Sequence, residues 1–137
     1  MSGPAADVAL VVPAVPDSIA VIRQTMSGIC EALGADPRVI GDVKLAATEA
    51  CTNVVLHAYA GTGEGTIEID ASADGDELTL LVRDHGPGMT PAPMAEGLGL
   101  GLPLIAALTS SLTIVEPDGG GTEVSMTVSL RDHPTEP

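Results

Sequence analysis

Three polar residues recur at four-residue spacing in the segment TEACTNVVLHAY, residues 48–59: Glu49, Asn53 and His57. The residues between them are mostly small or apolar, a pattern typical of a helix packed against a core. Because each helical residue turns about 100°, residues four apart lie on the same side of the helix. Such a stripe is most often a solvated face, so the spacing alone does not establish a site.

The residue types favour chemistry over simple solvation. Mg²⁺ prefers oxygen ligands, keeps several waters, and often takes one protein ligand together with substrate phosphates, a role that the Asn53 carbonyl suits. Glu49, one turn earlier, could accept the proton of an attacking hydroxyl or water. For His57 two interpretations stay open, because it could pack against or cap the helix end as easily as take part in a reaction.

A second candidate lies in RDHGPGM, residues 83–89, directly after an expected strand. An ionised Asp84 only accepts hydrogen bonds, so it could receive an exocyclic amino group such as that of adenine. Gly86 and Gly88 would let the backbone approach a flat ring closely. The alternative is an ordinary turn, in which this pattern is common.

Two further glycine clusters complete the set. GLGLGLPLI, residues 97–105, places Gly99, Leu100 and Gly101 at a helix entry, where free N–H groups and the helix dipole favour phosphate. Tight packing is the alternative, and no P-loop signature occurs in the chain. In GGGTEV, residues 119–124, the Thr122 hydroxyl could bond a ring nitrogen or a water, or simply start a strand.

The composition limits the classes of function. Five Lys and Arg stand against nineteen Asp and Glu, a formal net charge of −14. This balance excludes a basic nucleic-acid footprint and a polybasic membrane patch. A bound phosphate would therefore depend on backbone N–H groups, a helix N-terminus and a metal ion.

The 137 residues suit one domain, expected over residues 7–131 with loose, flexible termini at 1–6 and 132–137. Phe and Trp are absent, so the core must use Val, Leu, Ile, Ala and Met. Cys30 and Cys51 lie in apolar helical patterns, which indicates reduced core thiols and a cytoplasmic chain. Neither a transmembrane helix nor a signal peptide is expected.

The patterning predicts the order β-α-α-β-β-α-β-β. Strands are expected at 7–13, 66–73, 77–84, 111–117 and 122–130, and helices from about 17 to 34, 36 to 59 and 98 to 110. Asp17 or Ser18 should cap the first helix, Gly34 should end it, and Asp36 with Pro37 should open the second. This order favours an α+β two-layer sandwich, with a mixed, mostly antiparallel sheet and the helices on one face.

Taken together, EACTNVVLHAY, DHGPG, GLGLPLI and GTEV resemble the N, G1, G2 and G3 boxes of the GHKL (Bergerat-fold) ATPase superfamily. The chain looks most like the anti-sigma-factor serine kinase branch, from its first strand to about Leu130. It lacks a preceding phosphoacceptor helical hairpin, which favours this stand-alone branch over the histidine kinases. The branch implies the Bergerat fold, ATP and Mg²⁺ as ligands, and a cytoplasmic protein without direct nucleic-acid or membrane contacts.

The resemblance also implies roles for individual residues. Glu49 matches the glutamate that serves the family as general base in phosphorylating a serine. Asn53 matches the asparagine that binds Mg²⁺. The remaining positions match the nucleotide contacts: Asp84, Gly86 and Gly88 around adenine, Gly99, Leu100 and Gly101 at the phosphates, and Thr122 near adenine. The implied partners are a sigma factor and an anti-anti-sigma (STAS) protein, with a possible homodimer.

One departure leaves alternatives open. The segment between the G1 and G2 boxes, TPAPMAE at residues 90–96, is short, rich in proline, and carries no Lys or Arg for the γ-phosphate. A catalytically weak, nucleotide-sensing module that regulates a partner is the first alternative to a kinase. An acidic interaction domain that no longer binds ATP is the second. On the first helix, Arg23 is either a solvated residue or a contact for an acidic partner.

Overall fold

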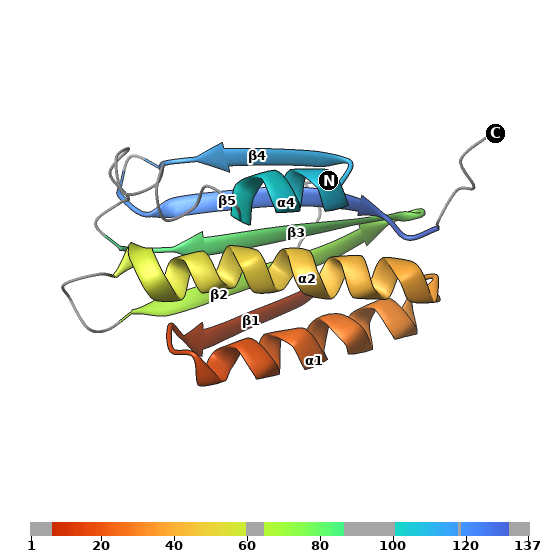
Figure 1. The fold of residues 1–137 in the computed structure, drawn as a ribbon, viewed down its shortest axis with the longest axis horizontal. Coiled ribbons are helices and arrows are strands. Elements are labelled where there is room, and N and C mark those ends of the chain that lie inside the picture. The colour runs from red at the N-terminus through yellow and green to blue at the C-terminus, as the bar shows by residue number, and fades with distance from the viewer. Residues whose placement is uncertain (1–6, 60–64, 87–100, 118, 132–137) are drawn as a thin grey trace.

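The computed structural model describes residues 7–59, 65–86, 101–117 and 119–131. Five strands form a single sheet in the order β1-β2-β3-β5-β4 (Figure 1). Their bounds are β1 Val8–Pro13, β2 Thr66–Asp74, β3 Glu77–Asp84, β4 Ser111–Val115 and β5 Thr122–Ser129. Each neighbouring pair in this order is antiparallel. The expectations for the two termini lie outside the described residues.

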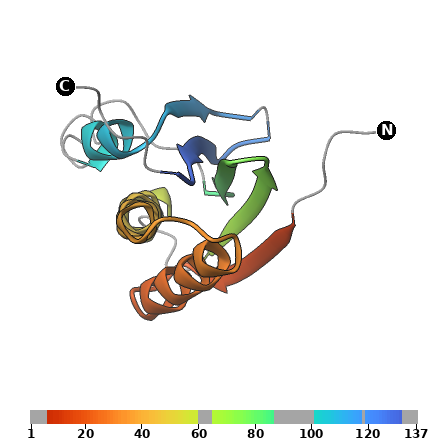
Figure 2. The same cartoon turned by 90° about the vertical axis from the view of Figure 1, so that its right-hand side faces the viewer.

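The helices lie together on one face of this sheet (Figure 2). They are α1 Asp17–Ala32, α2 Pro37–Asn53 and α4 Gly101–Leu108, and α2 packs between the other two. The predicted α+β sandwich and its element order are therefore confirmed. The strand pairing is simpler than the mixed sheet expected, since the described strands pair only in antiparallel fashion.

Alternation along each strand explains which face the helices cover. In β3, Leu78, Leu80 and Val82 are buried, and the intervening residues are half-buried. Burying one side of a strand in this way requires a side-chain period of two, which its sequence has. The buried face meets Ile22, Met26 and Cys30 of α1 and Val43, Ala47 and Ala50 of α2 in one core.

Two helix boundaries follow the predictions, and one detail does not. Gly34 adopts a positive φ of 72° just after α1, and Asp36 precedes Pro37 at the start of α2. The predicted cap by Asp17 or Ser18 is wrong, because the Ser18 hydroxyl donates to the Pro13 carbonyl at 2.6 Å instead. That bond ties α1 to the end of β1 rather than satisfying the helix's own N–H groups.

The second helix was predicted to run to about Tyr59, but its α-helical part ends at Asn53. From Val54 to Ala58 it continues as a π turn, called η1 here, before Tyr59 ends it. A π turn uses i→i+5 hydrogen bonds and is often found at functional sites. The change begins directly after Asn53, so the two ends of the TEACTNVVLHAY segment have different helical geometries.

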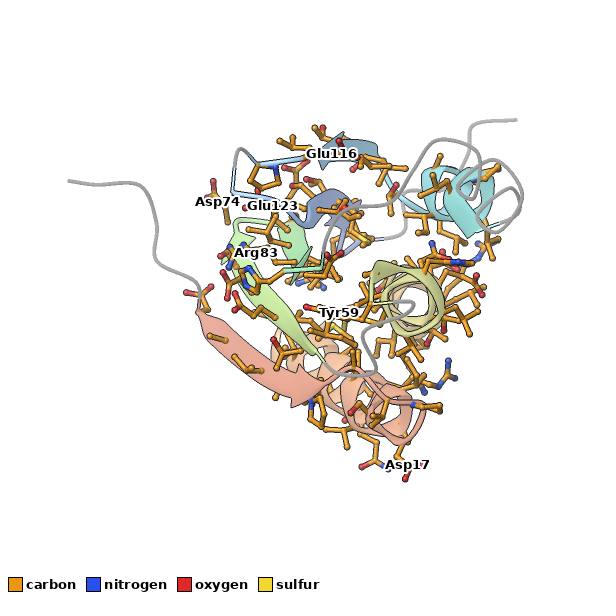
Figure 3. All side chains as sticks on the ribbon, turned by 90° about the vertical axis from the view of Figure 1, so that its left-hand side faces the viewer. Asp17, Tyr59, Asp74, Arg83, Glu116 and Glu123 are labelled. Carbon is orange, nitrogen blue, oxygen red and sulfur yellow. The ribbon has the colours of Figure 1, made fainter. Side chains whose placement is uncertain are left out.

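The opposite face of the sheet is polar and carries an ion-pair cluster. Arg83 contacts Glu68 at 3.0 Å, Asp70 at 3.1 Å and Glu123 at 3.2 Å. Figure 3 labels Arg83 and Glu123 on the side of the sheet away from α2 and α4. Because successive residues of a strand point to opposite faces, Arg83 and its neighbour Asp84 serve different sides of the molecule.

Candidate functional site

A hollow lies where α2, α4 and one end of the sheet meet, and the described residues enclose a space of about 20 Å³ in it. Three of its lining residues are buried and polar, namely Asn53, Asp84 and Thr122. The rest are mainly apolar: Ala50, Val54, Val82, Leu102, Ile105, Ile114, Glu116 and Val124. Apolar walls with a few convergent polar groups are typical of a small-molecule site.

Asp84 ends β3 with only 2% of its surface exposed. Burial raises the pKa of its carboxyl, and this effect outweighs the lowering by the Gly86 N–H, the nearby His85 and the Thr122 N–H. The Gly86 N–H donates to Asp84 Oδ1 at 3.0 Å, which fixes the carboxyl group within a tight turn. A buried carboxylate in this state is stabilised by any ligand that brings it a further hydrogen-bond donor.

Thr122 begins β5 directly opposite Asp84 in the antiparallel ladder. It is 3% exposed, and its Oγ1 has no hydrogen-bond partner among the described residues. An unsatisfied buried hydroxyl costs roughly 1–3 kcal/mol, and native proteins contain few of them. The position of this hydroxyl on the wall of the hollow therefore indicates a ligand that completes its bonding.

Asn53 is the last residue of α2, and 9% of its surface is exposed. Its side chain offers the hollow a neutral carbonyl oxygen. Within the described ranges there is no group of three or more His, Cys, Asp or Glu side chains that could hold a metal ion. A cation here would need one protein oxygen, waters and ligand phosphates, which is the coordination that Mg²⁺ commonly accepts.

Two glycines are required by close approach of the backbone. A Cβ on Gly86 would lie 2.0 Å from the Ala58 carbonyl oxygen, and one on Gly121 would lie 2.1 Å from the Asp84 carbonyl oxygen. Gly121 also has a positive φ of 87°. Gly86 was expected to admit a flat ring, but the close approach it permits is to the end of η1. Both glycines thus hold the segments around Asp84 together.

The other predicted residues are placed less directly. Glu49 is half-buried on α2, one turn before Asn53, and His57 is half-buried on η1. Among the described residues, neither belongs to the lining of the hollow. Gly101 begins α4, whereas Gly88, Gly99 and Leu100 lie outside the described residues. The structure therefore joins Asn53, Asp84 and Thr122 and leaves the catalytic position of Glu49 as a proposal.

Sequence reasoning missed the apolar walls and the glutamate at the rim. Leu102 and Ile105 of α4 line the hollow together with Val82 and Val124 of the sheet, and none of the four was predicted as a site residue. Their apolar type gave no signal, since core and ligand-binding walls use the same residues. Glu116, labelled in Figure 3, follows β4 and is exposed. It also lines the hollow.

Comparisons with known proteins agree with this geometry. Residues 12–128 match the model of the histidine kinase-like ATPase domain. The serine-protein kinase RsbW of Bacillus subtilis is 33% identical over 144 aligned positions, covering 90% of this chain and 88% of that protein. RsbW of Bacillus licheniformis is 36% identical, covering 86% and 82%.

This chain is a histidine kinase-like ATPase of the RsbW serine-protein kinase branch.

Solved structures place the RsbW-like chain in the same fold. It matches the structure of the RsbU and RsbW domains of Rv1364c from Mycobacterium tuberculosis with a TM-score of 0.70 and 27% identity. The match covers 90% of this chain and 32% of that longer one. The histidine kinase AdeS of Acinetobacter baumannii shares the fold alone, with a TM-score of 0.51, 13% identity, and coverage of 88% and 68%.

Membership of this family implies ATP binding and a serine-protein kinase class of activity. In the RsbW-like chain, the boxes predicted from sequence lie around one hollow as far as the described residues extend. Among those residues, no helix is both long and apolar enough to cross a membrane. The two cysteines are free and buried, as predicted.

Proposed function

We propose that this protein is an ATP-dependent serine-protein kinase that phosphorylates an anti-anti-sigma (STAS) protein on serine and sequesters a sigma factor by partner switching. The observation that supports nucleotide binding is the convergence of Asn53, Asp84 and Thr122 on one apolar hollow, with the Thr122 hydroxyl lacking a partner among the described residues. The apolar walls suit the two faces of adenine. Asp84 accepts its exocyclic amino group, and Thr122 bonds a ring nitrogen or a water.

Asn53 is the proposed ligand for the cation that accompanies ATP. It lies on the same wall as Ala50 and Val54, where α2 changes to η1. When bound, Mg²⁺ neutralises charge on the phosphates during transfer. Asn53 would supply one oxygen to it, and Gly99, Leu100 and Gly101 would supply backbone N–H groups to the phosphates.

Glu49 is the proposed general base. In the transfer step, the serine hydroxyl oxygen of the partner attacks the γ-phosphorus, and the bond from the γ-phosphorus to the bridging oxygen breaks. Phosphoserine and ADP are the products, and the serine proton passes to the Glu49 carboxylate. Four residues, slightly more than one helical turn, separate Glu49 from Asn53, about 6 Å along the axis, so base and cation can serve the same phosphate.

Labelled phosphate transfer tests this proposal. The wild type should transfer phosphate from γ-labelled ATP with Mg²⁺ to the serine of a candidate STAS protein, for example one encoded beside this gene. Glu49→Gln should keep ATP binding and lose at least about 100-fold in transfer rate. Glu77→Gln is the matched control, because it makes the same change at an exposed position at the far end of β3. Absence of transfer to every candidate would refute the kinase.

The nucleotide-sensing module remains the second candidate, since residues 90–96 carry no cation for the γ-phosphate. This module would bind ATP and a partner without phosphorylating it. A wild type that binds ATP, releases or captures the partner with nucleotide state, and leaves its serine unmodified supports the module. Phosphoserine that disappears in cells carrying Glu49→Gln excludes it.

The partner surface is also a proposal. Arg23 donates to the Thr48 hydroxyl at 2.9 Å and lines an open groove with Lys44, between α1 and α2. Glu31 also lines this groove, so its two cations exceed its negative charge by one, and in a chain of such high negative charge this local excess would attract an acidic partner segment. An Arg23→Glu protein that binds the sigma factor and the STAS protein normally would count against this contact. A homodimer and a cytoplasmic location are proposed from the branch alone.

A further inference from the structure

The Tyr59 hydroxyl joins two strands beside the hollow. It accepts a hydrogen bond from the His85 backbone N–H at 2.8 Å and donates one to the Thr66 carbonyl oxygen at 2.7 Å. Thr66 begins β2, and His85 follows the last residue of β3. Figure 3 shows Tyr59 between the end of α2 and the sheet.

The ring of Tyr59 packs closely against Gly65 and lies near Gly86. A Cβ on Gly65 would lie 2.2 Å from its Cζ, and one on Gly86 would lie 3.4 Å from its Cδ1. The ring therefore requires a residue without a Cβ at position 65, whereas its approach to Gly86 is an ordinary contact. The ring position is therefore fixed by packing as well as by the two hydrogen bonds of its hydroxyl.

The His85 peptide group connects Tyr59 to Asp84, the carboxylate proposed to bind adenine. His85 lies between Asp84 and Gly86, and the Gly86 N–H donates to Asp84 Oδ1. Fixing the His85 N–H fixes the peptide plane that leaves Asp84, and so restricts the turn that orients the carboxyl. The Tyr59 hydroxyl thus reaches Asp84 through one hydrogen bond, to the His85 N–H, and the peptide bond that joins His85 to Asp84.

The π turn determines where Tyr59 is found. Asn53, before η1, lines the hollow, while Tyr59, after η1, contacts the outer strand ends. A π turn accommodates one more residue than an α turn, so it rotates the residues after it relative to those before it. One continuous segment therefore contacts the ligand hollow with Asn53 and the turn after Asp84 with Tyr59.

We infer that Tyr59 is a positioning residue for base recognition, which sets the Asp84 carboxylate at the angle needed for the adenine amino group. This inference rests on the proposed ATP binding. Inosine triphosphate tests it because inosine carries a carbonyl oxygen where adenine carries the amino group. Loss of the correct carboxylate angle should weaken ATP binding more than inosine triphosphate binding.

The first experiment compares Tyr59→Phe with the wild type by equilibrium titration. The variant keeps the ring and removes only the hydroxyl. We expect ATP affinity to fall about 10-fold and inosine triphosphate affinity to change less than about 2-fold. Thr79→Val is the matched control, because it removes a β3 hydroxyl that pairs with Thr127 at 3.5 Å, outside the hollow's lining. Equal losses for both nucleotides, or an unchanged ratio, would overturn the positioning role.

A second measurement does not depend on the variant folding. The chain contains one tyrosine, so uniform 3-fluorotyrosine labelling reports Tyr59 alone by ¹⁹F NMR. Saturating ATP should shift this resonance more than saturating inosine triphosphate, because ATP brings the exocyclic amino group proposed to donate to Asp84, whereas the donor of inosine is a ring N–H at a different position. An equal response to both nucleotides contradicts the inference.

The outcomes also separate the inference from the proposed function. A wild type that binds neither nucleotide refutes the proposed function, and with it the role of Tyr59. A wild type that prefers ATP while Tyr59→Phe keeps that preference refutes only the positioning role. A wild-type preference that is lost in Tyr59→Phe and kept in Thr79→Val supports both.

Discussion

Asp84 and Thr122 lie directly opposite each other on antiparallel strands, and both are almost completely buried beside the same hollow. Burial of these two side chains lowers the stability of the ligand-free protein. It disfavours the charged carboxylate of Asp84 and leaves the Thr122 hydroxyl without a partner among the described residues. Two such groups side by side indicate that the fold gives up some stability for ligand recognition. Replacing either side chain should therefore weaken ligand binding without lowering the stability of the free protein.

Asp84→Asn should weaken ATP binding about 10-fold to 100-fold, because a hydrogen bond to a charged acceptor contributes about 1.5–3 kcal/mol. Isothermal titration with ATP and Mg²⁺ measures the change. Asp74→Asn, which removes one negative charge at an exposed site, controls for the high net charge. Undiminished ATP affinity in Asp84→Asn would show that adenine is recognised elsewhere.

The same variant should show a distinctive pH dependence of stability. Burial raises the folded-state pKa of Asp84, so the protonated carboxyl stabilises the fold below the unfolded pKa of about 4. That contribution is lost as pH rises through the folded pKa. Asparagine cannot ionise, so the free energy of unfolding of Asp84→Asn should gain on the wild type from about pH 4 upward and then level off. Urea denaturation across this range, again beside Asp74→Asn, provides the measurement; a difference that shrinks with rising pH would contradict the shift.

Thr122→Val should stabilise the free protein by about 1 kcal/mol, because it removes an unsatisfied hydroxyl and nearly keeps the side-chain shape. It should weaken ATP binding about 5-fold, through loss of one neutral hydrogen bond. Thermal unfolding with and without ATP measures both effects. Thr79→Val should gain less stability, since its hydroxyl is paired with Thr127. A destabilised Thr122→Val would mean that this hydroxyl already has a partner in the free protein.

Gly121→Ala should destabilise the protein by more than about 2 kcal/mol and lower its melting temperature by roughly 5–15 °C. The new Cβ would lie 2.1 Å from the Asp84 carbonyl oxygen on a backbone with positive φ. Gly119→Ala is the control, because a Cβ there meets no atom within 4 Å. Similar melting temperatures for the two variants would show that the strand ends are not closely packed at Gly121.

Cys51 should resist alkylation in the native protein. Burial raises the pKa of its thiol to about 12, so little thiolate, the reactive form, exists near neutral pH. Iodoacetamide at about pH 8, near the ordinary cysteine pKa, should label Cys51 only after unfolding, as followed by mass spectrometry. Labelling of Cys51 in the folded protein faster than global unfolding would show that this part of α2 opens locally.

Local patterns explain why most of the fold was predictable. The period of two in TIEID and the 3.6-like spacing of Ile22, Met26 and Ile29 depend on residues near one another in the chain. The predictions failed where contacts outside a helix competed with contacts within it. Ser18 found the Pro13 carbonyl rather than its own helix, and α2 changed to a π turn where Tyr59 contacts two strand ends.

The sequence by itself determined the chemical groups: an acceptor at Asp84, an amide at Asn53, a hydroxyl at Thr122 and the glycines that allow close approach. It could not determine that these groups share one hollow with Leu102 and Ile105, because apolar walls and an apolar core have the same composition. Only the tertiary structure decided which groups converge and which polar atoms lose water there. The groups converge because of strand register and helix packing between segments far apart in the chain. Burial at that place then raises the pKa of Asp84 and leaves the Thr122 hydroxyl without a hydrogen-bond partner among the described residues.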